Sequence, residues 1–258
     1  MKQYWQNFIK YRHLLFELVS RDLKVKYRRS ALGFAWSVLN PLLMMLVITA
    51  VFQTVFKSDI KNFPVYYLTG YLFFSFVTEA TNMSMVSIIG ASALIKKVYI
   101  PKYIFPLEKC MFCFVNMLLS FVATIIVMLV LKMPFTLSFL AFPIPMLYLF
   151  VFTLGLSLFL ATANVFFRDV GHLYGVFTTA WMYLTPVFYP MDILPDFMVN
   201  VMKFNPLYHY ILYFRAVVMY NHIPDLHSNL VCMAFSLVML VVGILFFKRK
   251  QDKFILYV

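Results

Sequence analysis

Cysteine and histidine, the side chains that most often act as nucleophiles or metal ligands, occur here without the spacing that such chemistry needs. Cys110 and Cys113 form a C-x-x-C pair, but both lie inside an apolar segment, where we expect small packing residues. The five histidines form no metal-binding pattern: His13, His172, His209, His222 and His227. None of the seven glycines begins the G-x-x-x-x-G-K-S/T loop that holds nucleotide phosphates. We therefore expect that the chain is not an enzyme and binds no metal or cofactor itself.

Glu79 is the one acidic side chain inside a long apolar stretch, a position that is costly and often functional. It could relay protons, as in an ion-coupled secondary transporter. Such folds show internal repeats and paired interrupted helices, and neither pattern is visible in this sequence. We favour a Glu79 that caps a helix, lines water or pairs with a basic group.

The composition places these residues in a membrane. Hydrophobic residues make up 63% of the chain and charged residues 12%, against about 45–50% and about 25% in soluble domains. The formal charge of +12 does not favour a nucleic-acid partner, because the basic residues flank apolar runs instead of covering one soluble face. A single membrane domain over residues 1–258 is predicted.

Six apolar windows are long enough to cross a bilayer, which takes about 20 residues. They predict an all-α membrane protein with spans at 34–56, 65–89, 108–131, 144–166, 171–189 and 228–247. Between the last two, 190–227 holds only short apolar pieces among charges. We expect this segment to form external, re-entrant or interfacial helices buried against the bundle.

Orientation follows from the basic residues near the ends of the spans. Most of the 22 Lys and Arg fall on one side if the N-terminus is cytoplasmic, as the positive-inside rule requires. The sequence therefore predicts a multi-pass protein of the cytoplasmic (inner) membrane with both termini in the cytoplasm.

The first 30 residues are too charged for a span and have helical amphipathicity. One side carries Lys10, Glu17, Arg21, Lys24 and Arg28, and the opposite side carries Phe8, Tyr11, Leu15, Leu18 and Val25. Such a helix lies at the headgroups of an anionic leaflet. It is either a plain anchor or a functional element.

Several motifs stand at defined places on this topology: 21-RDLKVKYRRSALGFAWSVLNPL-42, 96-KKVYIPKYIFP-106, 164-NVFFRDVGHL-173, 185-TPVFYPMDILP-195 and 205-NPLYHYILYFR-215. Together they resemble the permease subunit of ABC-2 type exporters of polysaccharides and polyol phosphates. The resemblance covers nearly the whole chain.

The resemblance implies a homodimer of six-span subunits around a central path, which exports a lipid-linked polysaccharide. Two copies of a separate ATPase subunit would bind ATP and Mg and drive transport. O-antigen, capsule and teichoic acid all remain open as cargo. Apart from Lys109 at the start of the third, the predicted spans lack Lys and Arg, which favours a neutral glycan over teichoic acid.

The loop 91–105 is the expected contact with the ATPase. The letters ASALIKKV can form a short helix, and we expect Pro101 and Pro106 to break it before the third span. The resemblance makes this loop a coupling helix, with Arg168 and Asp169 as a second contact. The residues expected to face the partner are Lys96, Lys97, Val98 and Tyr99. Two alternatives stay open: the lysines only set topology, and Arg168 only pairs with Asp169.

Aromatic residues are the candidates for the substrate path, because ring faces offer a repeating surface for a sugar chain. They lie at the start of span two and the outer part of span five: Tyr67, Tyr71, Phe74, Trp181, Tyr183 and Phe188. On a helix Tyr67 and Tyr71 lie about 40° apart and should share a face, whereas Tyr66 points elsewhere. An aromatic belt at the bilayer interface is the competing explanation.

A cluster of cations ends the N-terminal helix. Lys24, Lys26, Arg28 and Arg29 could bind the diphosphate of the lipid carrier, because cations form charge-assisted hydrogen bonds with phosphate oxygens. We treat these four as a candidate lipid-phosphate gate.

Overall fold

The computed structural model describes residues 2–28, 30–54, 60–191 and 194–257, and within these ranges the chain is helical with no strand. The all-α prediction is confirmed. The long helices are α1 Lys2–Tyr27, α2 Trp36–Thr54, α3 Phe63–Gly90, α5 Ile104–Val130, α6 Pro143–Phe166 and α10 Leu226–Lys250. The shorter ones are α4 Ser92–Ile95, α7 Val170–Tyr183, α8 Asp196–Met202 and α9 Pro206–Val218. Short 3-10 turns occupy Gly33–Ala35, Leu137–Ala141 and Gln251–Leu256.

Five helices in the described ranges are long and apolar enough to span a membrane: α2, α3, α5, α6 and α10. They match the first four predicted spans and the last one; residues 55–59 of the first lie outside the described residues. The remaining prediction, 171–189, corresponds to α7, whose 14 residues rise only about 21 Å, short of the roughly 30 Å of hydrocarbon. The six-span count therefore stays a prediction.

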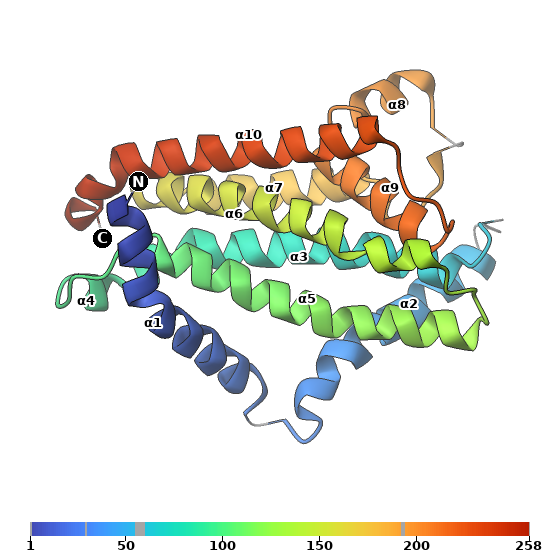
Figure 1. Ribbon diagram of the computed structural model, residues 1–258, viewed down its shortest axis with the longest axis horizontal. Coiled ribbons are helices and arrows are strands. Elements are labelled where there is room, and N and C mark those ends of the chain that lie inside the picture. Colours follow the sequence, from blue (N-terminus) through green and yellow to red (C-terminus); the bar gives the residue numbers. More distant parts are fainter. Residues whose placement is uncertain (1, 29, 55–59, 192–193, 258) are drawn as a thin grey trace.

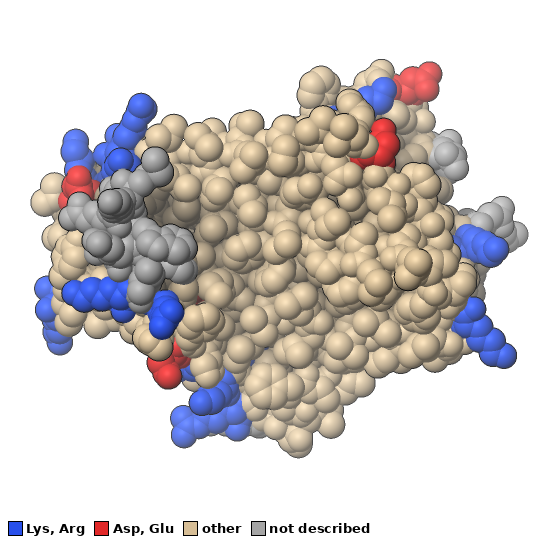
Figure 2. Space-filling model, in the orientation of Figure 1, with Lys and Arg blue, Asp and Glu red and all other residues tan. Residues whose placement is uncertain are grey.

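The long helices run side by side along the longest axis, and both chain ends lie at the same end of the bundle (Figure 1). We call this the terminal end of the bundle, and α4 lies there too. On the face seen in Figure 2, Lys and Arg gather at the two ends and the band between them is almost free of charge. This distribution is the one expected of a bundle that crosses a bilayer.

The N-terminal helix α1 packs one side on α5 and slants away from the bundle toward α2 (Figure 1). Leu15 and Val19 are buried, and Tyr11 and Leu18 pack near them, as the amphipathic pattern predicts. Val25 differs, because 61% of its surface is exposed. The side chain of Phe8 lies outside the described residues.

The predicted break at Pro106 is wrong. α5 begins at Ile104, so Pro106 lies in its first turn, where a missing N–H removes no intrahelical bond. The predicted short helix is confirmed as α4, but it covers only Ser92–Ile95. Lys96 to Tyr99 therefore follow the helix as a turn instead of belonging to it.

The segment before the last helix contains two short helices, α8 and α9, but only α9 is buried against the bundle as predicted. In α8, Phe197 and Val201 are exposed. α9 is buried along most of its length and packs against α3, α6 and α10. Asn205 caps it by accepting a hydrogen bond from the backbone N–H of Leu207 at 3.1 Å. With 13 residues α9 is too short to cross a bilayer. Its re-entrant course stays a prediction.

Candidate functional site

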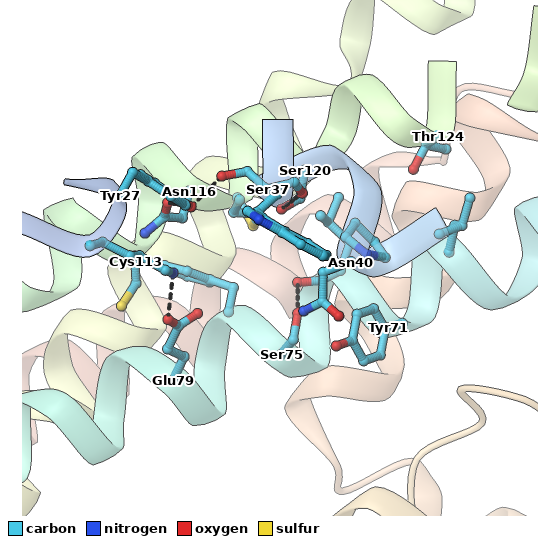
Figure 3. A pocket seen from close by; sticks show the side chains of 17 residues that line it. Tyr27, Ser37, Asn40, Tyr71, Ser75, Glu79, Cys113, Asn116, Ser120 and Thr124 are labelled. Atoms are coloured by element: carbon cyan, nitrogen blue, oxygen red, sulfur yellow. Dashed lines mark hydrogen bonds and ion pairs between the residues drawn. The ribbon is translucent and has the colours of Figure 1, made fainter. Parts of the chain in front are cut away.

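A polar cavity of about 230 Å³ lies between the end of α1 and helices α2, α3 and α5 (Figure 3). On α3 the lining polar residues repeat every fourth position: Tyr71, Ser75 and Glu79. On α5 the same spacing holds for Asn116, Ser120 and Thr124. Because i and i+4 share a helix face, each helix turns a polar stripe toward the other. Ser37 and Asn40 of α2 complete the polar lining.

Glu79 forms an ion pair with Lys26 of α1, with the ammonium nitrogen 3.1 Å from a carboxylate oxygen. One of the roles expected for Glu79, pairing with a basic group, is confirmed. Both side chains are more than a third exposed, so the pair contributes less than about 1 kcal/mol to stability. Its consequence is electrostatic: the positive and negative charges at the cavity wall cancel.

Hydrogen bonds tie the end of α1 to the other walls of the cavity. The Tyr27 hydroxyl bonds the Ser37 hydroxyl of α2 and donates to the Asn116 carbonyl oxygen of α5 at 3.2 Å. The Ser120 hydroxyl of α5 donates to the backbone carbonyl of Ser37 at 2.9 Å. These contacts hold three separate chain segments around one polar space.

A charged cluster fixes α1 to α5 closer to the terminal end. Lys109 bridges Asp22 of α1 and its own neighbour Glu108, whose side chain is buried. Burial acts to raise the pKa of Asp22, but the hydrogen bonds and positive charges of Lys109 and Arg21 outweigh it, so this pKa lies below its ordinary value. The carboxylate of Asp22 is thus held ionised between two cations.

The candidate lipid-phosphate gate is only partly free. Lys26 is paired with Glu79, whereas Lys24 and Arg28 are exposed. Arg29 lies outside the described residues. A shallow groove along α1 is lined by Lys24 and Arg28 together with Arg21, which the sequence analysis did not include in the gate. The spacing of three and four residues between these cations was the available signal.

The six aromatic residues of the predicted path form three separate pairs. Tyr67 and Tyr71 stack with ring centroids 5.4 Å apart, which confirms that they share a face. Phe74 meets Trp181 edge to face at 6.4 Å, and Tyr183 meets Phe188 at 6.3 Å. Tyr71 lines the cavity and Tyr183 is exposed, whereas three are buried inside the subunit: Tyr67, Phe74 and Trp181. The path role stays a prediction for all six.

Among the residues that the structure describes, Arg215 is the largest fully buried side chain. Its guanidinium donates to the backbone carbonyls of Pro186, Tyr66 and Val187 at 2.8–3.0 Å. It also lies 3.4 Å from the centroid of the Tyr66 ring, a close cation–π contact. Arg215 therefore joins α9 to α3 and to the turn after α7.

The two groups of predicted coupling residues both lie at the terminal end of the bundle. Lys96, Lys97, Val98 and Tyr99 are all exposed, as are Arg168 and Asp169. Ile95 and Tyr103, which flank the loop, pack on the same apolar cluster as Phe166, which precedes the second contact. The Tyr11 hydroxyl of α1 donates to the Tyr99 carbonyl at 3.1 Å and braces the loop. Within the described chain no ion pair joins Arg168 to Asp169, so both remain open to a partner.

A bundle of long apolar helices, with charges at its ends and a polar cavity inside, defines a multi-pass membrane protein. Residues 13–219 match the family model of the ABC-2 type transporter, and the chain belongs to that family.

Its relatives cover nearly its whole length. It is 32% identical to an O-antigen export system permease protein RfbA from Myxococcus xanthus, over 95% of both chains. A protein of the same description from Klebsiella pneumoniae is 29% identical over 93% of both. The polysialic acid transport protein KpsM of Escherichia coli is 21% identical over 91% of this chain and 92% of its own.

Proposed function

We propose that this chain is the membrane permease of an ATP-driven exporter that moves a lipid-linked polysaccharide outward from the cytoplasmic side. The observation that carries the proposal is the relative described as an O-antigen export permease, which this chain matches over 95% of both lengths. The fold supports it, because a membrane permease needs several helices that cross the bilayer, and five helices among the described residues are long and apolar enough to do so.

Energy comes from a separate ATPase subunit, present in two copies, which binds ATP and Mg. The coupling surface is the exposed turn Lys96–Tyr99 together with Arg168 and Asp169 at the terminal end. Two structural facts support this assignment: the turn is braced by Tyr11, and its flanking residues pack beside Phe166. Movement of the ATPase would therefore reach α1, α5 and α6 at once. The terminal end then lies in the cytoplasm, with both termini.

The glycan moves along a path shared by two copies of the chain. We expect the aromatic side chains with exposed surface, Tyr183 above all, to contact the glycan, and the buried ones to support them. The exposed cations of α1, Lys24 and Arg28, recruit the lipid diphosphate. Arg29, the next residue in the sequence, belongs to the same proposed gate, and Lys26 joins it when its ion pair with Glu79 opens.

The test is genetic. Removing the gene for this chain from its host should abolish the surface polysaccharide and leave lipid-linked glycan inside the cell, and a plasmid copy should restore export. A plasmid copy with Thr178→Val, a half-buried position on α7, is the matched control and should also restore it. Unchanged surface polysaccharide in the deletion strain, with no second permease gene present, would refute the proposal.

A further inference from the structure

The polar cavity between α1, α2, α3 and α5 holds two buried polar side chains that lack a complete set of partners. Asn116 is 5% exposed and Thr124 is 0% exposed. The amide nitrogen of Asn116 and the hydroxyl of Thr124 have no hydrogen-bond partner among the residues that the structure describes. Buried polar groups in proteins are almost always hydrogen-bonded, because leaving one unpaired is costly. Both residues line the cavity, so a ligand there can supply the missing bonds.

The charge of the cavity selects among ligands. Its two ionised groups, Lys26 and Glu79, neutralise each other at 3.1 Å. An anion such as a phosphate would face the carboxylate of Glu79, and a cation would face Lys26. The remaining polar groups are hydroxyls and amides, which bind uncharged donors and acceptors. A neutral ligand rich in hydrogen bonds fits this lining.

The volume of the cavity and its aromatic lining narrow the class of ligand further. Trp36, Tyr71 and Phe76 present aromatic surface to the same space as the polar stripes. A pyranose ring matches this combination, because its C–H faces pack on aromatic rings while its hydroxyls bond at the edge. A volume of about 230 Å³ is smaller than the roughly 300–1,000 Å³ of pockets for larger ligands, so the cavity takes one ring and not a chain.

We infer that this cavity is a binding site for one uncharged sugar ring within a single subunit, with Asn116 and Thr124 as the residues that hold it. The inference rests on the proposed function, in that the ring would belong to the exported glycan. It deepens that function by giving each subunit its own site beside α1, next to the cations proposed to hold the lipid diphosphate.

Saturation-transfer NMR on the full-length protein in lipid nanodiscs tests the site directly. The probes are methyl glycosides of neutral hexoses, 6-deoxyhexoses and N-acetylhexosamines, with methyl glucuronide and inorganic phosphate as charged comparisons. We expect at least one neutral glycoside to receive saturation and the two anions to receive none. Thr124→Val keeps the side-chain shape and should weaken binding about tenfold, as should Asn116→Leu. Thr178→Val on α7, outside the cavity, is the matched control and should bind as the wild type does.

A further variant keeps the test independent of folding. Ser75→Met fills the cavity from α3 without removing either holding residue, and the Ser75 hydroxyl that it replaces bonds the Leu72 carbonyl within the same helix. This variant should abolish binding, with the elution profile and thermal midpoint near those of the wild type. No saturation of any neutral glycoside, wild-type binding by both the Thr124 and Asn116 variants, or equal binding of phosphate would overturn the inference. Export by a wild-type protein that binds no glycoside would overturn this site alone; glycoside binding without export would overturn only the proposed function.

Discussion

The backbones of Gly155 in α6 and Gly243 in α10 touch, so that a Cβ atom on Gly243 would overlap the carbonyl oxygen of Gly155. A Cβ atom on Gly155 would likewise overlap the backbone at Met239. Small residues allow this close approach. In a membrane the hydrophobic effect does not drive helices together, so the close packing itself stabilises the helix pair. The contact joins the last helix to the middle of the bundle.

Gly243→Ala should therefore destabilise the protein by about 1–3 kcal/mol, since the backbone of α6 cannot move away as a flexible side chain would. The measurement is the midpoint of thermal unfolding in detergent, followed by size-exclusion chromatography. Gly175→Ala in α7 is the matched control, because a Cβ atom there meets nothing within 4 Å. That control should be neutral or slightly stabilising. Equal midpoints for both variants would contradict the backbone contact.

Arg215 should tolerate no replacement, including lysine. Arg215→Lys keeps the charge but a single ammonium group cannot reach three carbonyls in the guanidinium geometry, so at least one buried carbonyl loses its partner at a cost of about 1–3 kcal/mol. Gly70→Ala should have a similar effect, because its Cβ atom would lie 2.8 Å from the guanidinium. Arg249→Lys, at an exposed position, is the control. A thermal midpoint for Arg215→Lys as high as that of the control would disprove the role of the carbonyl contacts.

The Asp22 cluster predicts a pH dependence of stability. The folded pKa of Asp22 is lowered, so its contribution is present above its unfolded pKa, about 3.9, and is lost as pH falls through the folded value. Asp22→Asn should thus lower the thermal midpoint at pH 7, and its difference from the wild type should shrink below about pH 4. The titratable groups around it are Arg21, Lys109 and Glu108, and all three remain in the variant. A difference that stays constant from pH 7 to pH 3 would show that the charge of Asp22 is not the cause.

The coupling surface can be tested by cross-linking. Lys97→Cys and Tyr99→Cys should each cross-link to the ATPase subunit under oxidation, when that subunit carries cysteines in the facing groove. The native cysteines are buried and should not interfere. Lys132→Cys, exposed at the other end of the bundle, is the control and should give no product. Cross-links from Lys132 but not from Tyr99 would place the ATPase at the wrong end for this account.

The sequence predicted the long helices well, because uncharged windows near 20 residues have few other structures available in lipid. It missed the end of α7: Tyr183 ends the helix, but the following residues through Pro190 are just as apolar, so hydropathy alone joined them to the span. It did not show that Arg215 is buried. Only the fold brings together the three backbone carbonyls from distant segments that accept its hydrogen bonds.

The sequence analysis did not identify the cavity, although a signal for it was present. The four-residue spacing of Tyr71, Ser75 and Glu79, and of Asn116, Ser120 and Thr124, marks a polar face on each helix. The sequence could not show that the two faces lie opposite each other, because that depends on how α3 packs against α5. It also could not show that Lys26 pairs with Glu79, because that depends on where α1 packs on the bundle. That the loop from Lys96 to Tyr99 is exposed could be predicted, because a basic loop with prolines is unusual between two spans; its coupling role stays a prediction.

Transport in a defined system tests the central claim most directly. The chain and its ATPase would be reconstituted in vesicles with the terminal end and the ATPase facing outward, and lipid-linked glycan would be added to the outer leaflet. ATP would be supplied on the same side. Movement would be measured as the fraction of glycan that becomes protected from a glycosidase added outside the vesicles. We predict movement that requires ATP, the ATPase and this chain together, and that stops when the P-loop lysine of the ATPase is changed to alanine. Movement at the same rate in vesicles that lack the ATPase would contradict the account.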